Sequence, residues 1–302
     1  YSKAMIKMRG VRGKGLLGWV LLPFKLLIAF KQSFSAIRKY KPNVVLGMGG
    51  FASFPGGLMA KFLGKRLVIH EQNSIAGLTN KALSLFANRV LVAFPNALAK
   101  SVLVGNPVRK EITQCLPPNV RYMASSGKLK LLVVGGSLGA AALNDVIPKA
   151  LATLPENALF EVIHQAGEKH IDALQANYHA ACVEADARAY IQNMAEMYAW
   201  ADIVICRSGA LTVAELACVG VASVLVPFPH AVDDHQTYNA QYLSKHGAAM
   251  LIQQSEFNVA RASEILRNLT RESCLEMALK ARELAKPEAT ETVAQVCMEL
   301  AK

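Results

Sequence analysis

The chain has 302 residues, of which 53% are hydrophobic and 18% charged, and it contains no low-complexity tract. This composition is globular, and the length is sufficient for two ordinary domains. Six scattered cysteines without a CxxC pair indicate reduced thiols rather than a disulfide framework or a zinc site.

The net charge of +11 is confined to the first quarter of the chain. Residues 1–70 contain 13 Lys and Arg and no acid, whereas the rest of the chain contains 20 basic and 22 acidic side chains. This concentration predicts an anionic partner for the region: a membrane surface, a nucleic acid or a phosphorylated substrate.

An apolar stretch, GLLGWVLLPFKLLIAF at 15–30, lies inside this basic region. Pro23 and Lys25 interrupt it before it reaches the ~20 apolar residues of a transmembrane helix. The basic flanks, with Trp19 and Phe24, are typical of a segment in the bilayer interface. A buried helix with a basic exposed face is the alternative. No small-residue cleavage pattern follows, so we do not expect a signal peptide.

A nucleic-acid-binding module is a further alternative for the basic region. The aromatic residues there are spaced among aliphatic ones, whereas stacking platforms interleave aromatic residues with charge. We therefore expect no nucleic-acid partner.

Short apolar segments alternate with helical stretches, which predicts a parallel sheet and an α/β fold. Prolines at 107, 117 and 118 and the run SSG at 125–127 indicate a linker. We expect a first domain over 1–108, a linker over 109–129 and a second domain over 130–287, with 288–302 returning to the first domain after Pro287. The expected strands are 44–46, 67–69, 90–92, 131–134, 160–164, 189–191, 203–206 and 223–226.

A strand, a glycine turn and a helix are expected twice, at 44–57 (VVLGMGGFASFPGG) and 131–144 (LLVVGGSLGAAALN). Glycines permit close backbone approach, and the N-terminus of a helix presents N–H groups to an anion. Two such loops predict two phosphate-handling domains facing a shared cleft. Neither loop carries a Walker lysine, and no acid ends a following strand, so NAD and P-loop nucleotides are not expected.

A third strand-to-helix turn lies in ICRSGALTVAELACVG at 205–220. Glu215 lies one turn into the expected helix, where a carboxylate could accept hydrogen bonds from ribose hydroxyls. Thr212 and Glu215 also match a capping box, and the residue types leave both interpretations open. Arg207, where the strand ends, is either a fixed positive charge for a ligand or a structural ion-pair partner.

The segment after 229 contains His and Asp side chains that could form a metal cluster, namely His230, Asp233, Asp234 and His235. They supply no closed ligand set, so we expect neither a metal nor another cofactor.

Six motifs together resemble the MurG family of N-acetylglucosaminyltransferases. They are GMGGFASFPGG (47–57), HEQNSIAGLTNK (70–81), VGNPVR (104–109), VVGGSLGA (133–140), AWADIVICRSGALTVAE (199–215) and DDHQTYNA (233–240). The resemblance runs from about residue 8 to the end of the chain. It implies a GT-B fold, in which two Rossmann-like domains flank a cleft and the second binds the donor.

The resemblance also implies the reaction. The family transfers GlcNAc, with inversion, from UDP-GlcNAc to the C4 hydroxyl of undecaprenyl-pyrophosphoryl-MurNAc-pentapeptide, converting lipid I to lipid II for peptidoglycan synthesis. It acts peripherally at the cytoplasmic face of the bacterial inner membrane, so its partners are both substrates, the anionic membrane surface and other cell-wall and division proteins. A related lipid-directed GT-B transferase is the alternative, which the HEQN and GMGG motifs disfavour.

The family opens with a strand and a GGTGGH loop, whose His is a proposed catalytic base. Neither occurs in this sequence. The resemblance therefore implies a chain without its first βα unit, inactive as it stands and with an unknown base. Phe51 also stands where the family often has Tyr, so any role of that hydroxyl is lost.

The site residues follow from matching positions. For the donor, Glu215 would hold the ribose, the backbone of Ile191 the uracil, and Gln236 and Asn73 the GlcNAc hydroxyls. Gly47, Gly49 and Gly50 would cradle the acceptor pyrophosphate, with His70 and Glu71 as supporting catalytic candidates. The expected diphosphate contacts, with Arg109 completing the donor set, are Ser137, Ala210, Leu211, Thr212, Val213 and Ala214.

Overall fold

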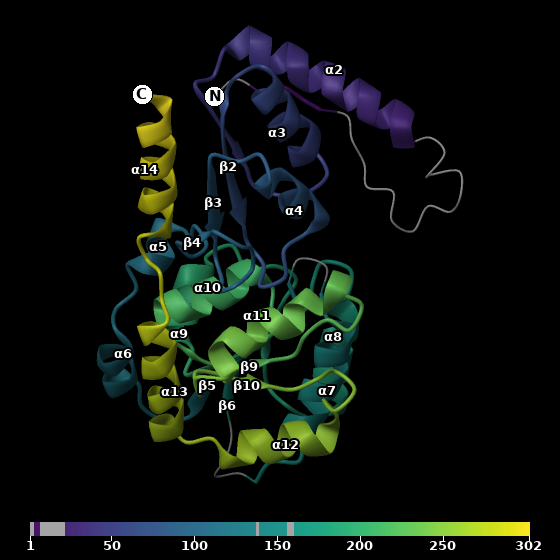
Figure 1. The fold of residues 1–302 in the computed structure, drawn as a ribbon. Helices are drawn as coiled ribbons and strands as arrows, with labels where there is room; N and C mark the ends of the chain where they lie inside the picture. The colour runs from purple at the N-terminus through teal and green to yellow at the C-terminus, as the bar shows by residue number, and fades with distance from the viewer. Residues whose placement is uncertain (1–2, 7–21, 137–138, 156–159) are drawn as a thin grey trace. The chain divides into compact units, whose positions relative to one another are not determined.

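The computed structural model describes residues 3–6, 22–136, 139–155 and 160–302, which fall into two compact units (Figure 1). Unit 1 comprises Tyr1–Pro107 and Glu288–Lys302, and unit 2 comprises Val108–Pro287. The chain therefore enters unit 2 once and returns to unit 1 after Pro287.

Unit 1 is a parallel sheet with helices on both faces. Its strands lie in the order β1 (Val44–Gly47), β2 (Arg66–Glu71), β3 (Arg89–Val92) and β4 (Val102–Leu103). The helices are α2 (Leu22–Tyr40), α3 (Ser53–Phe62), α4 (Leu78–Ser84) and α14 (Ala289–Ala301). The three expected strands of this half are confirmed, whereas the two-residue β4 was not expected, although it lies in the short apolar run 102–104.

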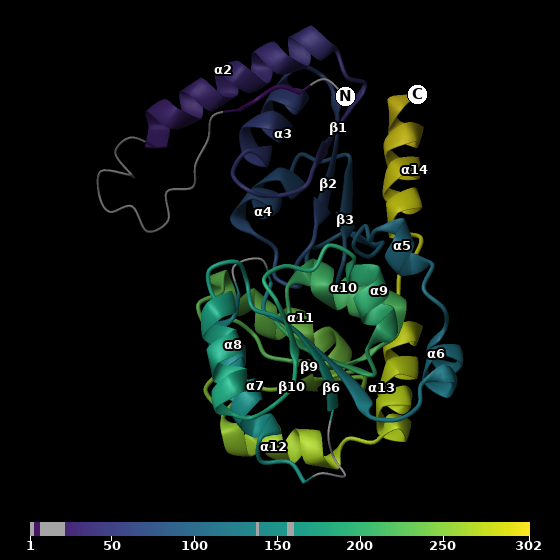
Figure 2. The same cartoon turned by 180° about the vertical axis from the view of Figure 1, so that it is seen from behind.

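Alternation along β2 explains why both faces are covered. Leu67 and Ile69 pack with Leu83 of α4, while Val68 points the other way and packs with Val293 of α14. Figures 1 and 2 show α14 across the sheet from α3 and α4. The C-terminal helix therefore completes the core of a sheet whose strands all precede residue 104.

Helix α2 packs against α3 yet leaves apolar side chains in solvent. Phe24, Leu27 and Ile28 lie on one helical face and are 68, 72 and 53% exposed. For residues 22–30, the described part of the apolar stretch, this exposure contradicts the alternative of a buried core helix. Trp19 lies outside the described residues. No helix in the described ranges is both long and apolar enough to span a bilayer.

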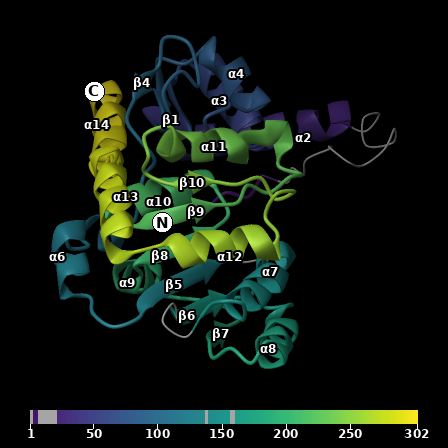
Figure 3. The ribbon, with the colours of Figure 1, turned by 90° about the horizontal axis from the view of Figure 1, so that it is seen from below.

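Unit 2 is built on a parallel sheet with the strand order β10-β9-β8-β5-β6-β7. Figure 3 shows α7, α8 and α12 to one side of this sheet and α6, α9 and α13 to the other. The strand bounds are β5 (Leu129–Val134), β6 (Phe160–Gln165), β7 (Asp186–Arg188), β8 (Ile203–Cys206), β9 (Ala222–Leu225) and β10 (Met250–Leu251).

The helices of unit 2 connect these strands. Their bounds are α5 (Lys110–Thr113), α6 (Pro118–Ala124), α7 (Ala141–Leu151), α8 (Ile171–Ala180), α9 (Met194–Trp200), α10 (Ala210–Val219), α11 (His235–Ser244), α12 (Val259–Asn268) and α13 (Arg271–Glu283), with a 3-10 turn, η2, at Val232–Asp234. The strand expected at 189–191 was wrong: β7 ends at Arg188, because the ladder to β6 pairs residues 186–188 with 163–165.

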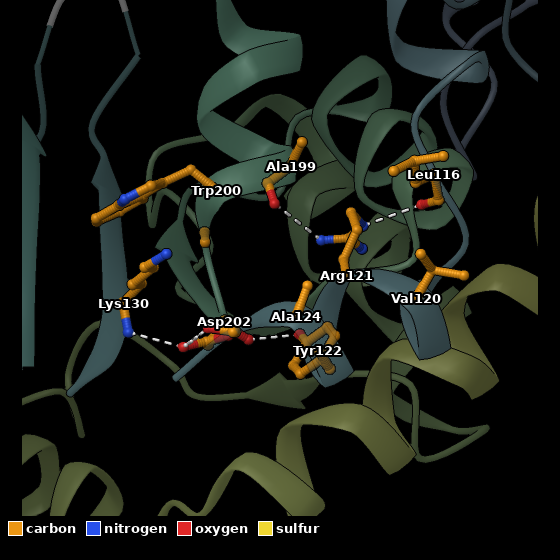
Figure 4. A pocket seen from close by; sticks show the side chains of 11 residues that line it. Leu116, Val120, Arg121, Tyr122, Ala124, Lys130, Ala199, Trp200 and Asp202 are labelled. Atoms are coloured by element: carbon orange, nitrogen blue, oxygen red, sulfur yellow. Dashed lines mark hydrogen bonds between the residues drawn. The ribbon is translucent and has the colours of Figure 1, made fainter. Parts of the chain in front are cut away.

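The segment expected as a linker, 109–129, packs within unit 2. The Tyr122 hydroxyl of α6 donates to the Asp202 carbonyl over 2.5 Å and accepts from the Ala222 N–H at 3.2 Å. Arg121 donates to backbone carbonyls that include Leu116 and Ala199. Arg121, Tyr122 and Asp202 line a cavity of about 300 Å³ at the amino edge of β5 and β8 (Figure 4). The structure thus assigns to unit 2 residues whose prolines suggested a free connection.

Candidate donor-binding and acceptor-binding sites

The central strands of unit 2 end level with one another. Val134 of β5 pairs with Gln165 of β6 and with Cys206 of β8, and Cys206 pairs with Leu225 of β9. The loops that follow these strands therefore leave from one edge. In parallel α/β sheets this carboxyl edge is where ligands bind.

Helix α10 starts at this edge without a side-chain cap, as does α7, whose N-cap is Ala140. Helix α10 begins at Ala210 after the N-cap residue Gly209, which has φ −60° and ψ 147°. A Cβ on Gly209 would meet only Thr212 Oγ1, at 3.6 Å, so the fold itself does not require a glycine there. The partial positive charge of the helix end is thus open to an anion beside residues 211–214.

Glu215 lies one turn further along α10, and its carboxylate is oriented by two neighbours. Arg109 Nη2 lies 3.4 Å from Oε1, and the Tyr198 hydroxyl donates to Oε2 at 3.3 Å. Burial raises the pKa of Glu215, while Arg109 and the Tyr198 hydrogen bond act against that rise. The capping-box alternative was wrong, because the N-cap is Gly209 rather than Thr212. Tyr198 was not anticipated.

Among the described residues, two backbone carbonyls and a side-chain amide oxygen hold the Arg207 guanidinium, and no carboxylate does. Its Nη1 donates to the carbonyls of Val226 and Pro227, each at 3.0 Å, and its Nη2 to Gln254 Oε1 at 2.5 Å. The guanidinium also lies over the Phe228 ring, 5.6 Å from its centroid. Arg207 therefore ties β8 to the segment after β9, and these contacts take the place of the ion pair that was one of its two expected roles, while its role as a charge for a ligand stays a prediction.

The glycine loop between β5 and α7 is constrained by packing as well as by conformation. A Cβ on Gly139 would overlap the carbonyl oxygen of Ala166, and one on Gly135 would lie 2.5 Å from the Ala140 N. Gly136, with φ +80°, has no atom within 4 Å of that position. Gly139 is therefore required by the fold itself. Ser137 lies outside the described residues.

Ile191 and the glycine loop are joined by a buried side chain that the sequence did not single out. Gln165, which ends β6, donates from Nε2 to the Gly136 carbonyl at 3.0 Å and accepts at Oε1 from the Ile191 N–H at 3.3 Å. The available signal was an uncharged amide at the carboxyl end of a strand, directly before the next loop.

Gln236 accepts a hydrogen bond from the Phe228 N–H at 2.9 Å, which fixes its amide near the end of β9. The nearby acids are engaged locally: Asp234 Oδ1 accepts from Thr237 Oγ1 at 2.7 Å, and Asp233 and Asp234 both have positive φ. Within the described ranges, no His, Cys, Asp and Glu side chains form a group that could hold a metal ion.

In unit 1 the loop after β1 carries two glycines with φ +76°, Gly49 and Gly50. Gly47 is buried, and a Cβ on Gly49 would lie 3.3 Å from both Gln72 Oε1 and Asn80 Nδ2. Ser53 Oγ donates to the Gly49 carbonyl at 2.5 Å. The expected strand–turn–helix is confirmed, with the glycine backbone placed beside the end of β2.

His70, the penultimate residue of β2, is fully buried with both ring nitrogens engaged. Nε2 lies 2.8 Å from the Gly105 carbonyl, which can only accept, so Nε2 carries the proton. Nδ1 then accepts from Gln72 Nε2 at 3.2 Å. Burial lowers the pKa of His70, which keeps the ring neutral. The ring thus fastens β2 to the VGNPVR stretch.

Glu71 organises the HEQN loop. Its Oε1 accepts from the Asn73 N–H at 2.9 Å, and its Oε2 accepts from Asn80 Nδ2 at 2.8 Å and from the Gly77 N–H at 3.1 Å. The carboxylate, only 3% exposed, closes the loop from 72 to 77 and sets the direction of Asn73.

Comparison with known proteins decides the family. Residues 130–295 match the family model of the glycosyltransferase family 28 C-terminal domain, and residues 2–92 match that of the glycosyltransferase family 28 N-terminal domain. The chain belongs to glycosyltransferase family 28. As a family 28 protein it has two parallel α/β sheets in the GT-B arrangement, and the expected fold class is confirmed.

Individual relatives carry the MurG name or its full equivalent. A UDP-N-acetylglucosamine–N-acetylmuramyl-(pentapeptide) pyrophosphoryl-undecaprenol N-acetylglucosamine transferase from Cupriavidus metallidurans is 58% identical and covers 98% of this chain. The protein of that name from Azoarcus sp. is 57% identical over the whole chain. The crystal structure of Acinetobacter baumannii MurG superimposes with a TM-score of 0.85 at 40% identity and covers 98% of this chain.

These matches confirm the resemblance to the MurG family. This chain spans 83 to 85% of the length of those three proteins. None of them supports the expectation that the chain is inactive as it stands, and we withdraw that expectation.

Proposed function

We propose that this family 28 protein is an inverting N-acetylglucosaminyltransferase that converts lipid I to lipid II. It would move GlcNAc from UDP-GlcNAc to the C4 hydroxyl of undecaprenyl-pyrophosphoryl-MurNAc-pentapeptide. The names of the similar proteins support the substrates. The observation that carries the donor half is the uncapped N-terminus of α10 with Glu215 one turn beyond it.

In this proposal unit 2 holds the nucleotide and the sugar of the donor. Glu215 accepts hydrogen bonds from the ribose hydroxyls, and the amides of 210–214 bind the diphosphate. The Ile191 N–H already donates to Gln165, so Ile191 would offer its carbonyl to the uracil. Arg109, paired with Glu215, adds positive charge beside the nucleotide, and Gln236 offers its amide to the GlcNAc hydroxyls.

The reaction is a single displacement. The acceptor C4 oxygen bonds to the anomeric carbon as the bond from that carbon to the phosphate oxygen breaks, and UDP leaves with the electron pair. Negative charge then grows on the diphosphate, where the N-terminus of α10 stabilises it. A base takes the C4 hydroxyl proton, and we assign that base to no described residue.

The acceptor pyrophosphate would bind the backbone of Gly47, Gly49 and Gly50 in unit 1. His70 and Glu71 are proposed as positioning residues, because the His70 ring holds the Gly105 carbonyl and the Glu71 carboxylate holds the loop from 72 to 77. Asn73, directed by Glu71, is the proposed sugar contact of unit 1.

We also propose peripheral attachment to the cytoplasmic face of the inner membrane through α2. The exposed Phe24, Leu27 and Ile28 would enter the interface, and the surrounding Lys and Arg would face anionic headgroups. The proposed acceptor is linked to a membrane lipid, so the protein must meet it at the membrane surface. Cell-wall and division proteins are further proposed partners.

The reaction is tested by incubating the chain with UDP-GlcNAc and a lipid I analogue and following the disaccharide-lipid product. Formation of that product supports the proposal. Transfer to diacylglycerol but not to the MurNAc acceptor would favour a different lipid-directed transferase instead.

A further inference from the structure

Gln165 is a buried amide in the described part of unit 2 that connects two separate segments of the proposed donor site. Its side chain is 3% exposed. Nε2 donates to the Gly136 carbonyl in the β5–α7 loop, and Oε1 accepts from the Ile191 N–H beyond β7. The Gln165 carbonyl also accepts from the Gly135 N–H at 3.4 Å.

The two contacts require an amide. One partner is a carbonyl, which only accepts, and the other is an N–H, which only donates, so the linking group must do both. A carboxylate would face the Gly136 carbonyl with a second acceptor, and an apolar side chain would leave both backbone groups without this partner in a buried place. The partners also fix which end of the amide is nitrogen.

We propose that Gln165 is a positioning residue that sets the base-binding segment at Ile191 against the diphosphate side of the glycine loop at Gly136. This role rests on the proposed function, since it presumes that UDP-GlcNAc binds this edge. A ligand that reaches both segments depends on their mutual placement, whereas a ligand that reaches one does not. Gln165 should therefore matter more for UDP-GlcNAc than for uridine.

The first test is calorimetry on the 302-residue chain with UDP-GlcNAc and with uridine. Gln165→Met keeps the length of the side chain but removes both hydrogen bonds. We expect it to weaken UDP-GlcNAc binding about tenfold, and uridine binding by a distinctly smaller factor.

The matched control is Ser263→Ala. Ser263 is 6% exposed and hydrogen-bonds the Ala150 carbonyl at 3.3 Å, near the far end of α7. This variant should lower the melting temperature without changing either affinity, which separates a general loss of stability from a loss of positioning.

The second test uses Gln165→Glu, which is informative even where the Met variant folds poorly. A protonated carboxyl has one donor and one acceptor and can reproduce both hydrogen bonds, while the ionised form cannot. UDP-GlcNAc affinity relative to the unmodified chain should therefore be reduced at pH 8 and recover as pH falls toward about 5.5, because burial raises a carboxyl pKa into this range.

Three results would overturn the proposal: an unchanged affinity in folded Gln165→Met, equal losses for the two ligands, or a Gln165→Glu affinity whose ratio to the unmodified chain is the same at every pH. Failure of the unmodified chain to bind UDP-GlcNAc would instead overturn the proposed function and this role with it. Binding by the unmodified chain without dependence on Gln165 removes the positioning role alone.

Discussion

The hydroxyl of Tyr198 donates to Oε2 of Glu215 from helix α9, so the carboxylate is oriented by a residue on a different helix. Tyr198 is fully buried, and burial raises the pKa of its hydroxyl well above the ordinary value. It is therefore a donor at any physiological pH. Arg109 approaches the other carboxylate oxygen at 3.4 Å. Glu215 thus presents a fixed pair of acceptors at the carboxyl edge of unit 2.

This geometry predicts a ribose-specific defect in variants of Glu215. Glu215→Ala should weaken UDP-GlcNAc binding by about 1–3 kcal/mol, the usual cost of losing hydrogen bonds to a charged group. Calorimetry with UDP-GlcNAc and its 2′-deoxy analogue measures it, and the loss should be smaller for the analogue. An unchanged affinity with a lowered melting temperature would make Glu215 purely structural.

Tyr198→Phe should reproduce part of that defect and add a pH dependence. Removing the hydrogen bond raises the pKa of Glu215 further, because the hydroxyl stabilises the ionised form. UDP-GlcNAc binding needs the ionised carboxylate, so it should fall at a higher pH in the variant as the solution is acidified. Titrations between pH 5 and 8 check this, and identical profiles for the two proteins would contradict it.

Gly209 and Gly139 should respond differently to alanine. The Cβ of Gly209→Ala would contact only Thr212 Oγ1, at 3.6 Å, and a φ of −60° suits alanine, so the melting temperature should hardly change. The added methyl stands beside the first turn of α10, next to Thr212, and binding of UDP-GlcNAc should weaken by about 1–2 kcal/mol if diphosphate approaches there. Gly139→Ala, whose Cβ overlaps the Ala166 carbonyl, should instead lower the melting temperature and weaken UDP-GlcNAc and uridine alike.

Replacing Phe24, Leu27 and Ile28 together with Ser should reduce binding to phosphatidylglycerol vesicles. Each Lys or Arg near an anionic leaflet adds ~1 kcal/mol, and this attraction fades over a Debye length of ~10 Å at 0.1 M salt. The apolar contribution does not depend on salt in this way. Co-sedimentation should therefore show that the variant loses the binding that survives high salt.

The control for the membrane experiment is the triple Ser variant of Leu116, Val120 and Met123, which are 60, 46 and 83% exposed in unit 2. It removes a comparable amount of exposed apolar surface and should leave vesicle binding unchanged. Equal losses in the two triple variants, or no binding by the unmodified chain at low salt, would contradict attachment through α2.

His164 predicts an acid-sensitive fold. It is fully buried between the Tyr178 hydroxyl and Asn144 Oδ1, and burial lowers its pKa to about 3. In the unfolded chain the imidazole of residue 164 takes up a proton near pH 6.5. The stability that the buried, neutral His164 contributes is therefore fully present above pH 6.5 and declines as pH falls toward 3.

Denaturant unfolding at pH 7.5, 6.5 and 5.5 measures this decline. His164→Gln should be less stable at pH 7.5, yet lose less stability between 7.5 and 5.5, because its amide does not titrate. Parallel stability curves for the two proteins would show that the pH response arises elsewhere.

Sequence reasoning located most strands and both glycine turns because continuous apolar runs and glycines carry those signals locally. It missed β4 and β10, which are two residues each, and placed β7 three residues too late. The misplacement arose because Ala189–Ile191 is apolar for another reason: Ile191 is buried beside Gln165 rather than within the ladder.

The partners of the site residues could not be predicted in the same way. Arg109 and Glu215 are separated by more than one hundred positions, and Gln165 touches residues 29 and 26 positions away. No periodic pattern encodes such pairings, since they depend on which strands become neighbours. Capping was misassigned for a related reason, because a Thr and a Glu at capping spacing also occur inside a helix whose N-cap is an earlier glycine.

Helix α14 has a consequence for how the chain acquires its structure during synthesis. The face of the unit 1 sheet that carries Val68 and Leu91 is covered by Val293, which the ribosome adds only after all of unit 2. Through that interval the apolar face lacks its cover, which makes unit 1 the more aggregation-prone half of a nascent chain. Unit 2 has a different fate, because its residues are contiguous, and it can fold as soon as Pro287 leaves the tunnel.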